Sequence, residues 1–90
     1  MKSVLVDDTE HCFFCGRPYP EAHHALSGTG RRKIADKYKM IIPLCHECHM
    51  RLHDTGQGKR FLQIIAQDWY EENVGTREQF IREFGKSFKE

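Results

Sequence analysis

The spacing of the cysteines constrains this chain more than any other feature. Cys12 and Cys15 form one Cys-x2-Cys pair, and Cys45 and Cys48 form a second pair about thirty residues later. Two such pairs match the ligands of a structural zinc site, in which four thiolates surround the ion at Zn–S distances of about 2.3 Å. A chain of 90 residues buries only a modest core, so a bound metal is a natural supplement to it. The four cysteines therefore predict a structural Zn²⁺ ion.

Two disulfides, or four unrelated thiols, are the alternative interpretation of the same cysteines. The N-terminus lacks the apolar core and cleavage site of a signal peptide, so we expect a reducing, cytoplasmic location, where such pairs favour metal over disulfides. No segment approaches the roughly 20 apolar residues of a membrane span, so no membrane partner is expected. His11 and His46 adjoin the cysteines and could replace one as a ligand, but we expect both to face solvent.

The histidines form a second group in the middle of the chain. His23 and His24 are adjacent, and the spacing of His49 and His53 places these two one turn apart on a helix. Such a pair suits a shared transition metal, and either His23 or His24 could complete a set of three ligands. The alternative is a set of surface histidines on a polar helix. We expect metal binding, because the cysteine pairs would tie the two histidine segments together.

Apolar periodicity and turn residues predict a small α+β fold. The expected segments are a strand at Met1–Val6, strand arms at Ala22–Leu26 and Met40–Leu44, one or two helical turns at Arg31–Lys39, and helices at Cys45–Asp54, Lys59–Asn73 and Thr76–Gly85. Thr76 and Gln79 have the spacing of a capping box. Trp69, Phe80 and Phe84 lie on apolar stripes that we expect to pack in the core rather than to stack on bases.

A basic cluster lies between the two strand arms. Its members are Arg31, Arg32, Lys33, Lys37 and Lys39. The net charge of the chain is only +1, which argues against a protein that coats nucleic acid along its whole surface. Beside the histidines, the cluster would instead contact phosphates without reading the base sequence. The alternative is an ordinary solvated face.

Taken together, these residues resemble the HNH, or ββα-metal, endonuclease motif in its four-cysteine zinc variant, which is common in phage and restriction nucleases. The resemblance covers residues 12–56 and lies in Glu21-Ala-His23-His24, a hairpin, Pro43-Leu44-Cys45-x2-Cys48-His49, and His53. The Glu-x-His-His sequence is also similar to that of the DNase colicins. The resemblance implies one ββα-metal zinc domain over residues 1–90, with its core at residues 11–56 and two additional helices at residues 59–85.

The resemblance also implies roles for individual residues. His23, His49 and His53 would bind one catalytic divalent ion, either Mg²⁺, Mn²⁺, Ni²⁺ or Zn²⁺. His24 would act as the general base on a water molecule, and Glu21 would orient a histidine or the water. The substrate would be double- or single-stranded DNA. The chain would be encoded by a phage or prophage, and a phage or host recombination or packaging protein would recruit it.

The chain departs from the family at Met40, which stands roughly where an asparagine usually tethers the loop of the general base. Methionine cannot make that hydrogen bond, although Asp36 or Lys39 could if the hairpin register shifts. Two other functions stay open: a non-catalytic zinc module that binds nucleic acid or protein, and a redox protein that uses its Cys-x2-Cys pairs. The histidines discriminate the nuclease from the zinc module, because a structural module needs the four cysteines and has no need of the histidines.

Overall fold

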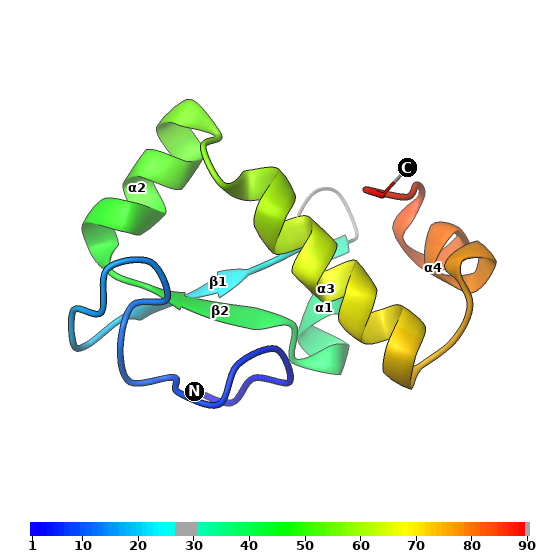
Figure 1. Ribbon diagram of the computed structural model, residues 1–90, viewed down its shortest axis with the longest axis horizontal. Helices are drawn as coiled ribbons and strands as arrows, with labels where there is room; N and C mark the ends of the chain where they lie inside the picture. The colour runs from blue at the N-terminus through cyan, green and yellow to red at the C-terminus, as the bar shows by residue number, and fades with distance from the viewer. Residues whose placement is uncertain (27–30, 90) are drawn as a thin grey trace.

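A two-stranded antiparallel hairpin lies at the centre of the molecule, and helices surround it (Figure 1). The computed structural model describes residues 1–26 and 31–89, apart from the side chains of Arg31, Arg32 and Ala35. Within these residues the elements are β1 (Glu21–His24), α1 (Arg31–Tyr38), β2 (Ile41–Leu44), α2 (His46–Thr55), α3 (Lys59–Asn73) and α4 (Arg77–Phe84). The predicted α+β class is confirmed, and each predicted helix lies within one residue of the observed bounds.

The hairpin has one continuous register. His23 lies opposite Ile42, and His24 lies opposite Ile41. The Ala25 amide extends the pairing by donating to the Met40 carbonyl at 3.0 Å. Because side chains alternate along a strand, the adjacent residues His23 and His24 face opposite sides of the hairpin.

The N-terminal segment does not form the strand predicted at Met1–Val6. The Val4 amide does reach the Lys39 carbonyl, at 3.0 Å, but the next contact toward β2 comes from a side chain. The hydroxyl of Ser3 donates to the Ile41 carbonyl and accepts from the Leu5 amide. Such local side-chain bonds compete with a backbone ladder, so the segment runs past the hairpin as an irregular arm.

Specific residues fix both ends of α2. Cys45 is its N-cap, and its sulfur accepts a hydrogen bond from the Cys48 amide at 3.4 Å. Cys45 therefore precedes the helix, where the prediction made it the first helical residue. Gly56 ends the helix in a left-handed conformation with φ of 73°, and its amide donates to the Leu52 carbonyl. Gly58, with φ of 85°, then starts α3, so the chain turns sharply between the two helices.

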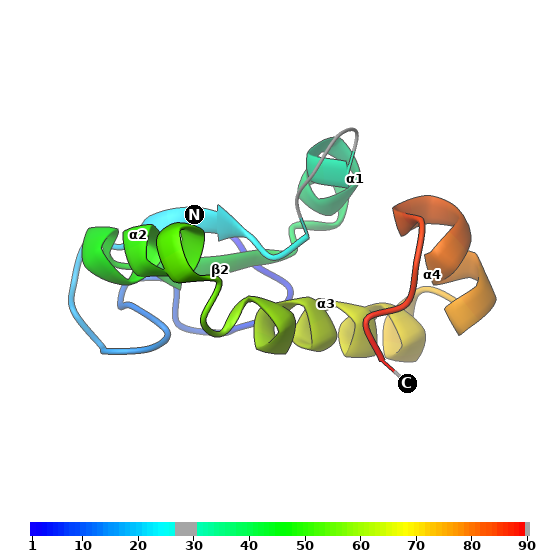
Figure 2. The same ribbon diagram turned by 90° about the horizontal axis from the view of Figure 1, so that it is seen from above.

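The helix α3 starts next to the end of α2 and runs across the molecule toward α4, whereas α1 and α4 lie away from α2 (Figure 1). In the view of Figure 2, α1 lies above the two strands and α3 lies below them. The helix α4 contacts both α1 and α3. None of the helices in the described part of the chain is long and apolar enough to cross a membrane.

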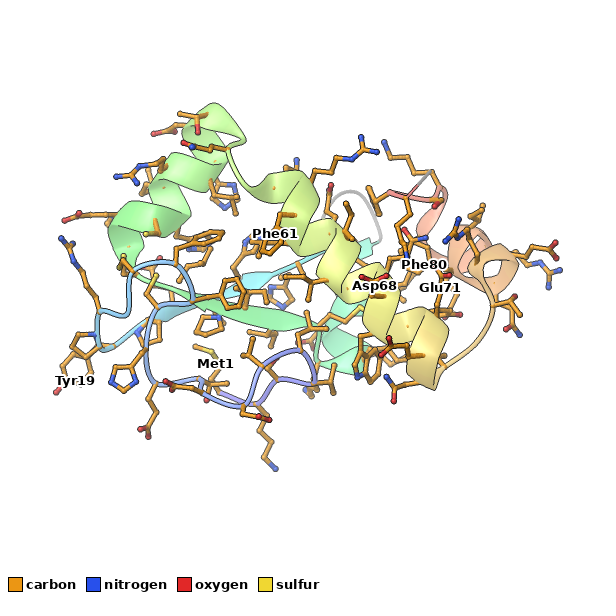
Figure 3. The ribbon with its side chains drawn as sticks, viewed as in Figure 1. Met1, Tyr19, Phe61, Asp68, Glu71 and Phe80 are labelled. Atoms are coloured by element: carbon orange, nitrogen blue, oxygen red, sulfur yellow. The ribbon has the colours of Figure 1, made fainter. Side chains whose placement is uncertain are left out.

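An aromatic core joins α3 to α4. Phe80 and Phe84 are buried, as is Tyr70 of α3, and the rings of Tyr70 and Phe80 meet edge to face with centroids 5.3 Å apart. Figure 3 shows Phe80 between the two helices. The predicted packing role of the aromatic stripe is confirmed, and burial of each such ring contributes roughly 1.5–3 kcal/mol. The predicted capping box of Thr76 and Gln79 starts α4.

Glu83 of α4 connects three helices through its carboxylate. It accepts hydrogen bonds from the Tyr38 hydroxyl of α1, at 2.9 and 3.0 Å, and from the Tyr70 hydroxyl of α3. Hydrogen bonds to a charged acceptor are roughly twice as strong as neutral ones. Burial and the nearby carboxylate raise the pKa of both tyrosines, so both hydroxyls keep the proton that they donate.

Replacing Glu83 should therefore loosen the attachment of α4. Glu83→Ala removes the acceptor of the buried Tyr70 hydroxyl, and we expect a loss of about 1–3 kcal/mol in the free energy of unfolding. Urea denaturation followed by circular dichroism measures it. Glu72→Ala, at an exposed position of α3, is the matched control and should change stability by less than about 0.5 kcal/mol. Equal effects of the two substitutions would show that the carboxylate does not hold the helices together.

Candidate metal centre

The four cysteine sulfurs converge on one point. All four lie within 4.8 Å of one another, and the sulfurs of Cys15 and Cys45 are 3.5 Å apart. A tetrahedron with Zn–S distances of about 2.3 Å has edges of about 3.8 Å, whereas a disulfide requires about 2.05 Å. All four cysteines are free thiols. The donor set and its spacing therefore fit a structural metal such as zinc, and the disulfide alternative is not the arrangement seen.

Backbone hydrogen bonds bring the two cysteine pairs together. The Gly16 amide donates to the Cys12 carbonyl at 2.9 Å and closes a tight turn, in which Gly16 has φ of 80°. The Phe13 amide donates to the Pro43 carbonyl at 2.8 Å and fixes this turn to the end of β2. Cys45 follows β2 at once. The first pair is thus held where the second pair begins.

The thiols of the cluster differ in acidity. Burial opposes ionisation of Cys12, but hydrogen bonds with the backbone of three neighbours outweigh it and lower the pKa of the Cys12 thiol to about 6. Burial and the adjacent thiols raise the pKa of Cys48 to about 12. Without a cation, the cluster therefore favours one ionised thiol. The negative charge of this thiolate opposes ionisation of the next thiol. A divalent cation offsets that repulsion, which is a further reason why the set suits a metal.

Three histidines form a second cluster, separate from the cysteines. The ligating nitrogens of His23, His49 and His53 all lie within 4.8 Å of one another. His49 and His53 are one turn apart on α2, with ring centroids 4.8 Å apart, and the His23 ring of β1 lies 5.2 Å from that of His49. Of the two candidates for the third member of the set, the hairpin brings His23 and not His24.

The environment of His23 keeps its imidazole neutral. The residue is 6% exposed, and burial, together with the charges of His49 and His53, lowers its pKa to about 4. A neutral imidazole with an available lone pair is the form that binds a metal. Three imidazoles at this separation are a chemically suitable ligand set for a metal ion.

Glu21 orients the cluster from the first position of β1. Its carboxylate accepts hydrogen bonds from Nδ1 of His49 at 2.8 Å and from Nδ1 of His46 at 3.0 Å. These two bonds lower the pKa of Glu21, which stays ionised. A carboxylate on one imidazole nitrogen directs the other nitrogen outward and raises its basicity, as is usual for metal-binding histidines. The sequence did not reveal the contact with the exposed His46.

His24 lies apart from the three-histidine cluster. Its Nε2 atom is 3.5 Å from a carboxylate oxygen of Asp36 in α1. The expected tether position is occupied by Met40, which is fully buried in the core. Asp36 is the acidic residue beside His24. Whether it replaces the tethering asparagine stays a prediction.

The basic residues lie on and after α1. Lys33, Lys37 and Lys39 are exposed. Arg31 and Arg32 belong to α1, but their side chains lie outside the described residues. The sequence missed another cation, Lys59, which lines the same pocket as His23 and His53. The only signal for it is the Gly-x-Gly turn after His53, which bends the start of the next helix back toward the histidines.

The cysteine cluster should be required for folding. It joins two distant segments in a small domain, so Cys45→Ser should abolish both metal binding and the native circular dichroism spectrum. His11→Ala, beside Cys12, is the control and should retain both, since His11 is paired with Asp8 at the surface. A Cys45→Ser protein with the native spectrum and thermal midpoint would contradict a structural metal at this position.

Comparison with known proteins provides no relative from which the roles of the two clusters can be inferred. No family model, curated protein or solved structure matches the chain. The α+β fold and the possible four-cysteine metal site are what the molecule itself establishes.

Proposed function

We propose that this protein is a metal-dependent DNA endonuclease of the HNH type, which hydrolyses phosphodiester bonds. The observation that carries the proposal is the convergence of His23, His49 and His53 next to a separate four-cysteine cluster. A structural zinc site is complete with four cysteines. A second set of imidazoles, oriented by a carboxylate, has no structural use and is typical of a catalytic metal site.

The two clusters would hold different ions. Thiolates favour Zn²⁺ as a structural ion, and the three imidazoles would bind the catalytic ion, whether Mg²⁺, Mn²⁺, Ni²⁺ or Zn²⁺. When bound, that ion supplies a Lewis acid for the phosphate and the leaving 3′ oxygen. The hydrogen bond from Nδ1 of His49 to Glu21 leaves Nε2 available as a ligand, and burial holds His23 in its ligating form.

His24 is the proposed general base. Since His23 and His24 alternate along β1, the strand would have to twist or bend for both rings to reach one phosphate. A neutral imidazole with a pKa of about 6.5 accepts a proton from water near neutral pH. As His24 takes this proton, the water oxygen bonds to phosphorus and the bond from phosphorus to the 3′ oxygen breaks. The leaving oxygen gains a proton from solvent, and His24 returns its own proton to solvent. Asp36 at 3.5 Å would stabilise the protonated imidazole and hold the ring in place.

The exposed lysines of the basic cluster would bind the DNA backbone. Lys33 and Lys37 project from α1, the helix that also carries Asp36, and Lys39 follows directly. Contacts from lysine to phosphate position a strand without reading its sequence. We include Arg31 and Arg32 in this surface on sequence grounds alone.

A non-catalytic zinc module is the second candidate. The buried Met40 favours it, because no side-chain amide stands where the family has its tethering asparagine. The module and the nuclease differ in the number of metal ions, since the module requires only the cysteine site.

Metal analysis of the intact protein separates these candidates. After exposure to Zn²⁺ or Ni²⁺ and removal of free metal, we expect two ions per chain. His53→Ala should lower this to one while the circular dichroism spectrum stays native, because the cysteine cluster remains intact. A wild-type protein that binds one ion, in the same amount as His53→Ala, would favour the module.

The two neighbouring histidines should fail in different ways. His23→Ala removes a ligand and should lose both the second metal ion and DNA cleavage. His24→Ala should retain the ion and DNA binding, yet lose the proton acceptor, with a fall of about 10²- to 10⁴-fold in cleavage rate. Metal titration and plasmid nicking on both variants measure this. If His24→Ala loses the ion and His23→Ala keeps it, the roles are reversed; if both variants cut normally, the nuclease proposal fails.

A further inference from the structure

A small pocket opens beside the three-histidine cluster. It has a volume of about 90 Å³ and is lined by His23, Leu52, His53, Gly56 and Lys59. These residues come from β1, from α2 and its end, and from the first position of α3. The pocket is well below the roughly 300–1,000 Å³ of sites for drug-sized ligands, so it suits a small ion or a single functional group rather than a whole nucleotide.

Two side chains in the pocket lack polar partners within the described chain. The His23 side chain is buried, with 6% of its surface exposed. Within the described residues it contacts the rings of His49 and His53 and forms no hydrogen bond. Lys59 forms no ion pair with any residue that the structure describes. Burial lowers the pKa of His23 most, followed by the charges of the other histidines and then that of Lys59. The charge of Lys59 therefore lies close enough to act on the His23 imidazole. A buried imidazole and an unpaired cation thus share one cavity.

The start of α3 adds a second source of positive potential. This helix has 15 residues, and its N-cap is Gly58, which supplies no side-chain hydrogen bond. The first amide groups of a helix lack partners inside the helix and carry the positive end of its dipole. Helix starts without a side-chain cap are favourable positions for an anion. Lys59 is the first residue of α3, so the helix start and the exposed Lys59 side chain meet at this pocket; the Lys59 amide itself donates to the Gly56 carbonyl at 3.1 Å.

We propose that this pocket is an oxyanion site, and that Lys59 binds a phosphate oxygen there. The ligand class follows from the pocket: the Lys59 cation and the helix start both favour a small anion with several acceptor oxygens, and none of the residues that line the pocket is a carboxylate that would repel it. That this phosphate belongs to a DNA strand rests on the proposed nuclease function. In that case Lys59 holds the phosphate against the three histidines, and α3 is part of the site.

Inorganic phosphate tests the oxyanion site directly. The full chain with its structural metal is titrated with phosphate in the absence of other divalent ions, and binding is followed by the broadening of the ³¹P resonance. Lys59→Gln should weaken binding about tenfold or more, because it removes a charged hydrogen bond, and Lys59→Arg should restore most of the affinity. Arg60→Gln removes the neighbouring charge, which does not line the pocket, and should bind phosphate as the wild type does.

A labelled DNA duplex, under the same conditions without cleavage, tests the source of the phosphate. Lys59→Gln should lower the slope of the logarithm of affinity against the logarithm of salt concentration by about 1. If Lys59→Gln binds phosphate as tightly as wild type, or if Arg60→Gln loses as much, the oxyanion site is wrong, whether or not the protein cuts DNA. If phosphate binding depends on Lys59 but the wild type neither binds nor cuts DNA, the oxyanion site stands and the nuclease function fails.

Discussion

The meeting of four sulfur atoms sets the geometry of the N-terminal half. The turn that carries Cys12 and Cys15 is bound to the end of β2 through Pro43, and Cys45 both joins the cluster and caps α2. The contact that closes the cluster therefore also determines where the strand ends and in which direction the helix leaves. Because α2 carries His49 and His53, the position of these imidazoles relative to β1 depends on the cysteines, which never touch the histidine pocket.

The hairpin places the adjacent residues His23 and His24 in different environments. Strand alternation sends His23 into a buried position among other imidazoles, where it stays neutral. It places His24 beside α1, where its Nε2 atom lies 3.5 Å from a carboxylate oxygen of Asp36. A ligand must hold its lone pair for a cation, whereas a base must gain and release a proton. The one-residue step from His23 to His24 along β1 provides both environments without any difference in side-chain chemistry.

Local signals account for most of what the sequence predicted. Glycines 56, 58 and 85, the Thr76 capping box and the apolar stripes mark the helices within one residue, and the Cys-x2-Cys spacing indicates the cysteine cluster without knowledge of the fold. The wrong and missing predictions concern residues whose conformation or position depends on a partner far away in the sequence. Ser3 replaces a backbone ladder with a side-chain bond, and Lys59 reaches the histidines only because two helices meet at a sharp turn. Neither is readable from residue spacing, because each depends on tertiary position.

One helix connects the four-cysteine cluster to the three-histidine cluster. The helix α2 contains Cys48 of the four-cysteine cluster and His49 and His53 of the three-histidine cluster. A single helical segment therefore belongs to both clusters. Ordering that segment at one end reduces the conformational freedom that the other end must lose on binding. Linkage is reciprocal: whatever factor the cysteine ion contributes to affinity at the histidines, an ion at the histidines returns to the cysteines. The two ions would then load cooperatively, and zinc supply would control whether the second site is competent.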